Sequence, residues 1–188
     1  MPGTDTDLAV AVFGSADPAP GHPLYEVARA VGALCARAGW TVVTGGYGGV
    51  MEGASRGAAE NGGRVVGVTC SIFGDRRPNR WLTETTRTRD LFERTRELIE
   101  RSRGYVVLHG QTGTLAELAM LWALSRAGCL GPRPVVVLGE RWKDVLAHLA
   151  RADVLPESQR ELVDYVETPE DAVRHLQDRL TTSSGDPL

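Results

Sequence analysis

The segment LAVAVFGS, residues 8–15, is where the fold can first be read. Leu8 to Phe13 is a continuous apolar run of strand length, and Gly14 and Ser15 end it abruptly. A run that is apolar at every position is typical of a strand covered on both faces of a parallel sheet. The segment therefore predicts a buried strand whose carboxyl end opens into a glycine–serine turn.

Short apolar runs alternate with helical periodicity over the rest of the chain. Further strands are predicted over residues 41–44, 64–69, 104–108, 134–138 and 163–166. Helices are predicted over residues 24–38, 50–60, 87–103, 114–127, 142–150 and from Thr168 onward, while residues 70–86 read as irregular. This alternation predicts a Rossmann-like, doubly wound parallel sheet with helices on both faces, a three-layer α/β/α fold.

Length and composition agree with one domain. The chain has 188 residues, enough to bury a proper core but too few for a second full domain. We expect a flexible N-terminus over residues 1–7, a single domain over 8–180 and a flexible tail over 181–188. The chain carries no apolar run of roughly 20 residues and no leader-like start, so we expect a cytoplasmic protein without a membrane partner.

Charge and residue usage exclude several classes of protein. With 21 basic and 24 acidic residues the net charge is −3, which argues against binding nucleic acid through its phosphates. The cysteines Cys35, Cys70 and Cys129 are far apart, and the histidines form no cluster, so no metal site is expected. Lys143 is the only lysine and follows no glycine loop, which excludes a pyridoxal Schiff base and a Walker A loop. No cofactor is expected.

Three turns come together at one edge of the predicted sheet. The carboxyl ends of parallel strands meet there, and ligands bind at that edge in folds of this type. The turns cover residues 14–15, 45–49 and 109–114. The last one suits an anion, because glycines permit close approach and the following helix offers free N–H groups and a positive dipole end. Its candidate phosphate-binding residues are Gly110, Thr112, Gly113 and Thr114; the alternative is a plain helix cap with tight-turn glycines.

The second glycine-rich turn lies within residues 44–53, TGGYGGVMEG. Dinucleotide binding is a weak interpretation, since the third glycine of that fingerprint is replaced by Met51 and no acidic residue ends the following strand. Close approach of the backbone to a smaller ligand, or simple tight packing, remains open. The candidate ligand contacts in this region are Gly14, Ser15, Gly45, Gly46 and Gly49.

Glu117 and Arg94 are the candidate catalytic side chains. Glu117 lies three residues after Thr114, where the helix dipole favours a carboxylate and a capping role is the alternative. Arg94 lies on the preceding helix, where a run of arginines is usually a solvated face. We expect the helix end and Arg94 to favour the ionised form of Glu117.

Taken together, these motifs resemble the LOG (LONELY GUY) family. The family signature Pro-Gly-Gly-x-Gly-Thr-x-x-Glu is similar to residues 109–117, HGQTGTLAE, and the family glycine loop is similar to residues 44–53. The sequence Phe92-Glu93-Arg94-Thr95 resembles the family's Arg-Lys helix, and residues 12–15 also fit. The likeness runs from about Leu8 to Trp142.

The resemblance implies a homodimeric phosphoribohydrolase with its active site near the subunit interface. Such enzymes cleave the N-glycosidic bond of a nucleoside 5′-monophosphate, a cytokinin riboside monophosphate or AMP, to the free base and ribose 5-phosphate. Cleavage passes through an oxocarbenium-like state. Glu117 could stabilise this cation, orient the water or attack C1′, while Arg94 would orient Glu117 and hold phosphate or ribose oxygens bidentately.

Three departures from the family pattern leave other functions open. His109 replaces the motif proline, Gln111 replaces its second glycine, and Thr95 replaces the lysine after the catalytic arginine. A bulkier loop with less positive charge also suits a carrier of the molybdenum cofactor, which binds a phosphorylated pterin on the same fold without hydrolysis. A nucleotide-binding protein that has lost its activity is the third interpretation.

Overall fold

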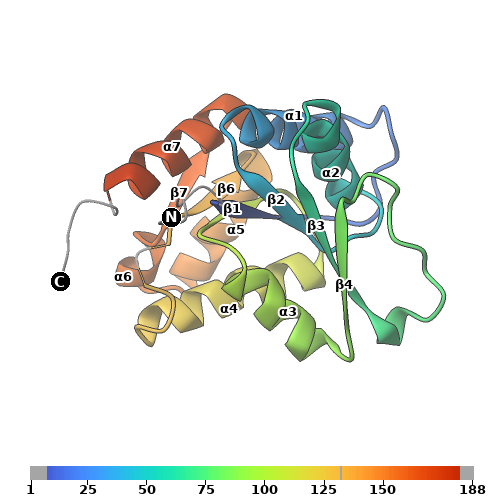
Figure 1. Cartoon of the computed structure of the whole chain (residues 1–188). Coiled ribbons are helices and arrows are strands. Elements are labelled where there is room, and N and C mark those ends of the chain that lie inside the picture. The colour runs from blue at the N-terminus through green and yellow to red at the C-terminus, as the bar shows by residue number, and fades with distance from the viewer. Residues whose placement is uncertain (1–7, 132, 183–188) are drawn as a thin grey trace, which may run out of the picture.

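The computed structural model describes residues 8–131 and 133–182, which form a seven-stranded parallel sheet of order β4-β3-β2-β1-β5-β6-β7 (Figure 1). The strands are β1 (Ala9–Phe13), β2 (Thr41–Thr44), β3 (Val65–Cys70), β4 (Glu84–Thr88), β5 (Gly104–Val107), β6 (Val135–Leu138) and β7 (Val163–Val166). Every pairing between neighbouring strands is parallel. The predicted doubly wound fold is therefore confirmed.

Helices cover both faces of the sheet. They are α1 (Pro23–Arg37), α2 (Val50–Glu60), α3 (Leu91–Glu100), α4 (Thr112–Arg126), α5 (Glu140–Arg151), the short α6 (Glu157–Arg160) and α7 (Pro169–Thr182). Figure 1 shows α1, α2 and α7 on one face and α3, α4 and α5 on the other. Each face encloses its own apolar core, and β1 alternates between them: Val10 and Val12 pack on the first face, Ala11 and Phe13 on the second.

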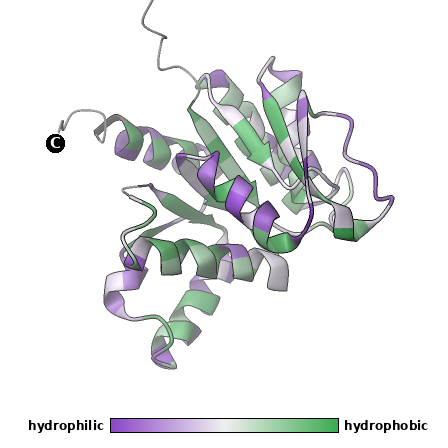
Figure 2. Cartoon of the chain, turned by 60° about the horizontal axis from the view of Figure 1, so that its bottom comes forward, coloured by the Kyte–Doolittle hydropathy of each residue, from purple (hydrophilic) through white to green (hydrophobic). Residues whose placement is uncertain are grey.

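Hydropathy follows this layering. The central strands are mostly hydrophobic, whereas α3 carries many hydrophilic residues (Figure 2). Within the described residues no helix is long and apolar enough to cross a membrane. The helix opened by Thr168 starts as predicted, since the Thr168 hydroxyl accepts a hydrogen bond of 3.1 Å from the N–H of Asp171. Helix α7 continues to Thr182, so the first two residues of the predicted flexible tail 181–188 are helical instead. The predicted flexible N-terminus 1–7 and residues 183–188 of the tail lie outside the described residues.

The interpretation of residues 70–86 as irregular was wrong at both ends. A single 3₁₀ turn, η1 (Ser71–Phe73), follows β3, and β4 begins at Glu84. Strand β4 reads ETTRT and lies at the edge of the sheet, with its side chains alternately more and less exposed. A polar edge strand lacks the apolar run that marks the central strands, because its outer side faces solvent. Its placement depends on its pairing with β3.

Two turns are tied together beside β1, where the strand order reverses direction. The N–H of Ser15, after β1, donates to the carbonyl of His109, after β5, at 3.0 Å. The carbonyl of Ser15 accepts from the N–H of Val50, the first residue of α2, at 2.8 Å. These bonds hold the ends of β1 and β5 and the start of α2 at fixed positions around one crevice.

Candidate active site

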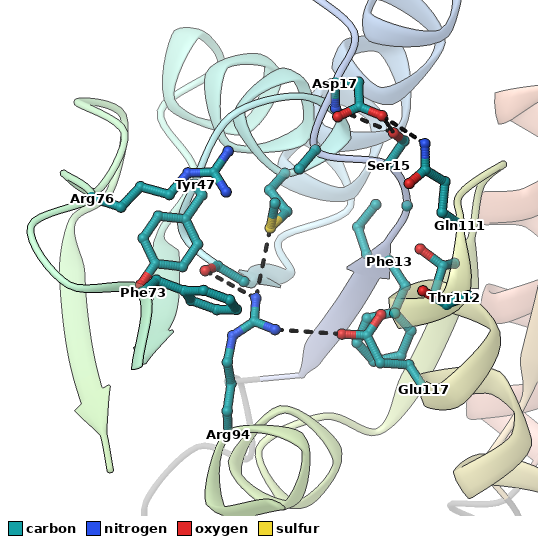
Figure 3. A pocket seen from close by; sticks show the side chains of 17 residues that line it. Phe13, Ser15, Asp17, Tyr47, Phe73, Arg76, Arg94, Gln111, Thr112 and Glu117 are labelled. Carbon is teal, nitrogen blue, oxygen red and sulfur yellow. Dashed lines mark hydrogen bonds and ion pairs between the residues drawn. The ribbon is translucent and has the colours of Figure 1, made fainter. Parts of the chain in front are cut away.

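A cavity of about 200 Å³ opens at the carboxyl ends of β1, β2 and β5 (Figure 3). Its wall comes from the turns after these strands, from η1 and the loop behind it, and from α3 and the first turns of α4. The lining residues are Val12, Phe13, Gly14, Ser15, Ala16, Asp17, Gly45, Tyr47, Met51, Phe73, Arg76, Arg94, Gln111, Thr112, Gly113, Thr114 and Glu117. The crevice expected from the topology is thus present.

Most of the predicted site residues meet in this cavity. Those that line it are Gly14, Ser15, Gly45, Arg94, Thr112, Gly113, Thr114 and Glu117. Gly46, Gly49 and Gly110 lie behind the wall instead. A Cβ at Gly49 would come 2.3 Å from the carbonyl oxygen of Ser15, and one at Gly110 would come 2.0 Å from the Thr114 hydroxyl. These two glycines let the turns pack closely, and Gly46 packs in the same way against Thr69.

Glu117 lies at the floor of the cavity, one turn into α4. Its side chain is only 14% exposed, and its Oε1 lies 3.8 Å from Nη1 of Arg94. Burial raises the pKa of this carboxyl to about 7, and the positive charge of Arg94 lowers it only in part. Arg94 favours the ionised form of Glu117, as expected, but its charge does not determine the pKa. Desolvation outweighs the ion pair, and the group is poised to exchange a proton near neutral pH.

Arg94 is fixed in place by backbone carbonyls. It projects from α3, whose N-cap Asp90 accepts a hydrogen bond of 2.8 Å from the N–H of Glu93. The Nε of Arg94 donates to the carbonyl of Val68 at 2.9 Å, and its Nη2 donates to that of Gly45 at 3.2 Å. Nη1 is the nitrogen turned toward Glu117 (Figure 3). This geometry agrees with orientation of Glu117. The bidentate hold on phosphate or ribose oxygens stays a prediction, and Nε and Nη2 already donate to the protein backbone.

The first turn of α4 faces the cavity without a side-chain cap. Gln111 is the N-cap residue but makes no capping bond. Its amide donates to Oδ2 of Asp17 at 3.0 Å, and the Ser15 hydroxyl donates to the same oxygen at 3.1 Å. The helix begins at Thr112, two residues earlier than predicted, so Gly113 and Thr114 belong to its first turn. Uncapped N–H groups at a helix N-terminus form a ready site for an anion.

The wall opposite Glu117 carries residues that the sequence analysis did not name as site residues. Tyr47 is buried, and its hydroxyl donates to the carbonyl of Cys70 at 3.1 Å and accepts from the N–H of Cys70 at 2.9 Å. Phe73 meets Tyr47 edge to face at 5.5 Å between centroids, and Arg76 lies over Tyr47 at 5.3 Å. Phe73 and Arg76 follow β3, so the topology alone could have placed them beside the turn after β2.

A second and larger cavity, about 960 Å³, lies on the other side of the Ser15, Asp17 and Gln111 cluster. His109 lines this cavity and not the first one, and its ring Nε2 lies 3.4 Å from Nη1 of Arg141. Partial burial, together with the charge of Arg141, lowers the pKa of His109. The residue that replaces the motif proline therefore points away from Glu117 and Arg94.

Comparisons with known proteins agree with these features. The SLOG cluster4 family model matches residues 7–173. A cytokinin riboside 5′-monophosphate phosphoribohydrolase of Mycobacterium marinum is 36% identical over 132 residues, which cover 69% of each chain.

Solved structures with the same fold include two proteins that bind the molybdenum cofactor. The molybdenum cofactor binding protein of Rippkaea orientalis superposes with a TM-score of 0.76 at 22% identity, over 94% of this chain and 99% of that one. The molybdenum cofactor carrier protein of Chlamydomonas reinhardtii gives 0.72 at 26% identity, over 93% of this chain and 99% of that one. The resemblance to the LOG family is confirmed, and by its match over residues 7–173 the chain belongs to the SLOG cluster4 family.

Proposed function

We propose that this protein hydrolyses the N-glycosidic bond of a nucleoside 5′-monophosphate, AMP or a cytokinin riboside monophosphate, to the free base and ribose 5-phosphate. The observation that carries the proposal is the buried Glu117 beside Arg94, one helix turn beyond an uncapped helix N-terminus. A relative with a phosphoribohydrolase name supports the same reaction class.

The start of α4 would bind the 5′-phosphate. The N–H groups of its first turn and the hydroxyls of Thr112 and Thr114 are suitable donors. Glu117 lies one turn further along the same helix, so a phosphate held there would bring the ribose toward the carboxylate. Binding energy from the phosphate would then position the reacting carbon.

The reaction exchanges one bond for another at C1′. The C1′–N bond breaks with its electron pair going to the base nitrogen, which gains a proton, while the oxygen of water bonds to C1′. Glu117 in its carboxylate form stabilises the developing cation and accepts the proton of the attacking water. A pKa of about 7 suits this role, because the group can take up and return a proton near neutral pH. Arg94 holds the carboxylate in place.

The test is release of free base from AMP, an N6-prenylated AMP, CMP and GMP. Glu117→Gln removes the carboxylate with little change in shape. Glu100→Gln is the matched control, since Glu100 is exposed at the end of α3 and does not line the cavity. We expect release by the parent protein and the control, and loss in Glu117→Gln. Equal rates in all three proteins would exclude Glu117 as the catalytic group.

A carrier of the molybdenum cofactor is the second candidate function. It is favoured by the solved carrier that shares the fold at 26% identity over almost its whole length. A folded protein that releases no base from any of these nucleotides, and that co-purifies with a fluorescent pterin, would support this alternative.

We also propose a cytoplasmic homodimer with the active site near the interface. Helix α4 supports an interface, because it carries Glu117 on one side and exposes Leu115 and Met120 on another. An apolar groove of about 600 Å³ lies along the same helix and is lined in part by Leu149 and Val154. Apolar side chains that gather on one surface are typical of contact surfaces between subunits.

A further inference from the structure

We infer that Phe73 and Arg76 form the base-binding subsite and that it favours a 6-oxopurine, as in GMP or IMP, over the 6-aminopurine of AMP. This inference rests on the proposed function, because it takes the phosphate to lie at the start of α4 and the ribose to lie over Glu117. It differs from the proposed substrates in one respect: it ranks the 6-oxopurine nucleotides GMP and IMP above AMP, and it names the residues that select them.

The direction of the bound nucleotide follows from the two ends of the cavity. Thr112 and Glu117 lie on one side of it, and Tyr47, Phe73 and Arg76 on the opposite side, with the guanidinium of Arg94 between them (Figure 3). A phosphate at the start of α4 and a C1′ carbon near Glu117 leave the wall with the aromatic rings for the base.

Phe73 offers this base a partly exposed aromatic ring. The side chain is 38% exposed and lines the cavity. Its position is fixed by the edge-to-face contact with Tyr47, which is 3% exposed and has its hydroxyl bonded to the backbone of Cys70. A nucleobase gains from stacking on an aromatic ring, whatever its identity. Phe73 therefore contributes to the affinity for a base, but little to the selectivity between bases.

Arg76 determines the selectivity between bases. In the described part of the chain its guanidinium lies over the Tyr47 ring, with Cζ 5.3 Å from the centroid, and it forms no ion pair. Guanidinium carries five donors and no acceptor. The O6 and N7 atoms of a 6-oxopurine are both acceptors and suit a bidentate contact, whereas the amino group of adenine is a donor and faces Arg76 unfavourably.

The experiment compares GMP, IMP, AMP and CMP with the parent protein and the variants Arg76→Ala, Arg76→Lys and Phe73→Leu. Arg77→Ala is the matched control, because Arg77 is the exposed neighbour and does not line the cavity. We expect the parent protein to prefer GMP and IMP over AMP by roughly tenfold or more in kcat/KM, through KM. Arg76→Ala should remove this preference, Arg76→Lys should restore little of it, and Phe73→Leu should weaken all bases alike. Arg77→Ala should keep the parent preference.

A binding measurement separates this inference from the proposed function. Dissociation constants of GMP, AMP and ribose 5-phosphate are measured by calorimetry for Glu117→Gln, with and without Arg76→Ala. A GMP preference that Arg76→Ala abolishes supports the subsite even if no protein releases base. Base release with a GMP-to-AMP ratio that Arg76→Ala leaves unchanged, or a preference for AMP, overturns the subsite alone. If Arg76→Ala weakened the binding of GMP, AMP and ribose 5-phosphate equally, Arg76 would contact the phosphate, and the proposed base subsite would be overturned.

Discussion

At the scale of single residues, the site depends on a buried carboxyl whose charge is only partly compensated. Arg94 faces Glu117 at 3.8 Å, which is too long for a strong hydrogen bond, while its other nitrogens are held by the carbonyls of Val68 and Gly45. The arginine is therefore a fixed charge beside Glu117. A carboxyl in such a place keeps a high pKa and can be protonated or ionised near neutral pH.

The raised pKa of Glu117 makes stability depend on pH. The pKa rises from an ordinary value of 4.5 to about 7 on folding. Such a group stabilises the fold fully below its unfolded pKa, and this contribution is lost as the pH rises through 7. Glutamine does not titrate, so the difference in free energy of unfolding between Glu117→Gln and the parent protein should depend on pH. Between acid pH and pH values above 7 it should shift in favour of the variant, on the order of 3 kcal/mol. Urea unfolding of both proteins across this pH range measures the difference, and a difference that is constant with pH would contradict the assignment.

Removal of Arg94 should act on the same carboxyl. In Arg94→Ala the charge that lowers the pKa of Glu117 is gone, so the pH midpoint of base release should move upward. The carbonyls of Val68 and Gly45 also lose a donor, which should cost about 1–3 kcal/mol of stability. The pH–rate profile and a thermal unfolding curve test the two effects. An unchanged midpoint in a variant that retains activity would show that Arg94 does not act on Glu117.

At the scale of elements, the close contact between α1 and α2 fixes the start of α2 at the site. Gly32 and Gly57 allow this approach: a Cβ at Gly32 would come 2.0 Å from the carbonyl oxygen of Ala54, and one at Gly57 would come 1.9 Å from that of Arg29. Both neighbours are helix backbone and cannot turn aside. The two helices therefore pack as one layer, which carries the glycine turn before Val50.

Gly57→Ala tests this packing. The added methyl group must push α1 and α2 apart, so the free energy of unfolding should fall by about 1–3 kcal/mol, although alanine is the better helix former. Chemical denaturation measures the change. A variant as stable as the parent protein would mean that the helices adjust freely.

The elements that were readable from the sequence are those buried on both sides. The predicted segment 8–13 contains β1, and 41–44 coincides with β2, because apolar runs mark strands between two layers of helices. The segment 163–166 coincides with β7, an edge strand that is only half-buried. Strand β4 and the wall residues Phe73 and Arg76 were missed, since they lie in a polar segment whose position depends on pairing with β3. The pKa of Glu117 could not be predicted either, because burial follows from tertiary packing and not from spacing along a helix.

At the scale of the whole molecule, one helix serves both the site and a surface. The start of α4 faces the cavity at the point where the strand order reverses, as expected for ligand sites in doubly wound sheets. The same helix exposes Leu115, which lines the groove together with Val154, and it also exposes Met120. A subunit seated on this groove would contact the helix that holds Glu117.

The proposed dimer predicts a linked loss of assembly and activity. Leu115→Glu with Met120→Glu introduces charges into the apolar surface, so the protein should elute as a monomer in size-exclusion chromatography with light scattering. Base release should fall with assembly, because the site lies on the same helix. A parent protein that is monomeric at concentrations where it is fully active would contradict the proposal.

The central claim, hydrolysis of a nucleoside 5′-monophosphate through Glu117, is tested most directly by one ratio. Base release from a 5′-monophosphate is measured for the parent protein and for Glu117→Gln at about pH 8, where a carboxyl with a pKa near 7 is ionised. The account predicts stoichiometric base and ribose 5-phosphate from the parent protein, and a rate lower by roughly a hundredfold or more in the variant. Equal rates, or intact nucleotide with both folded proteins, would contradict it.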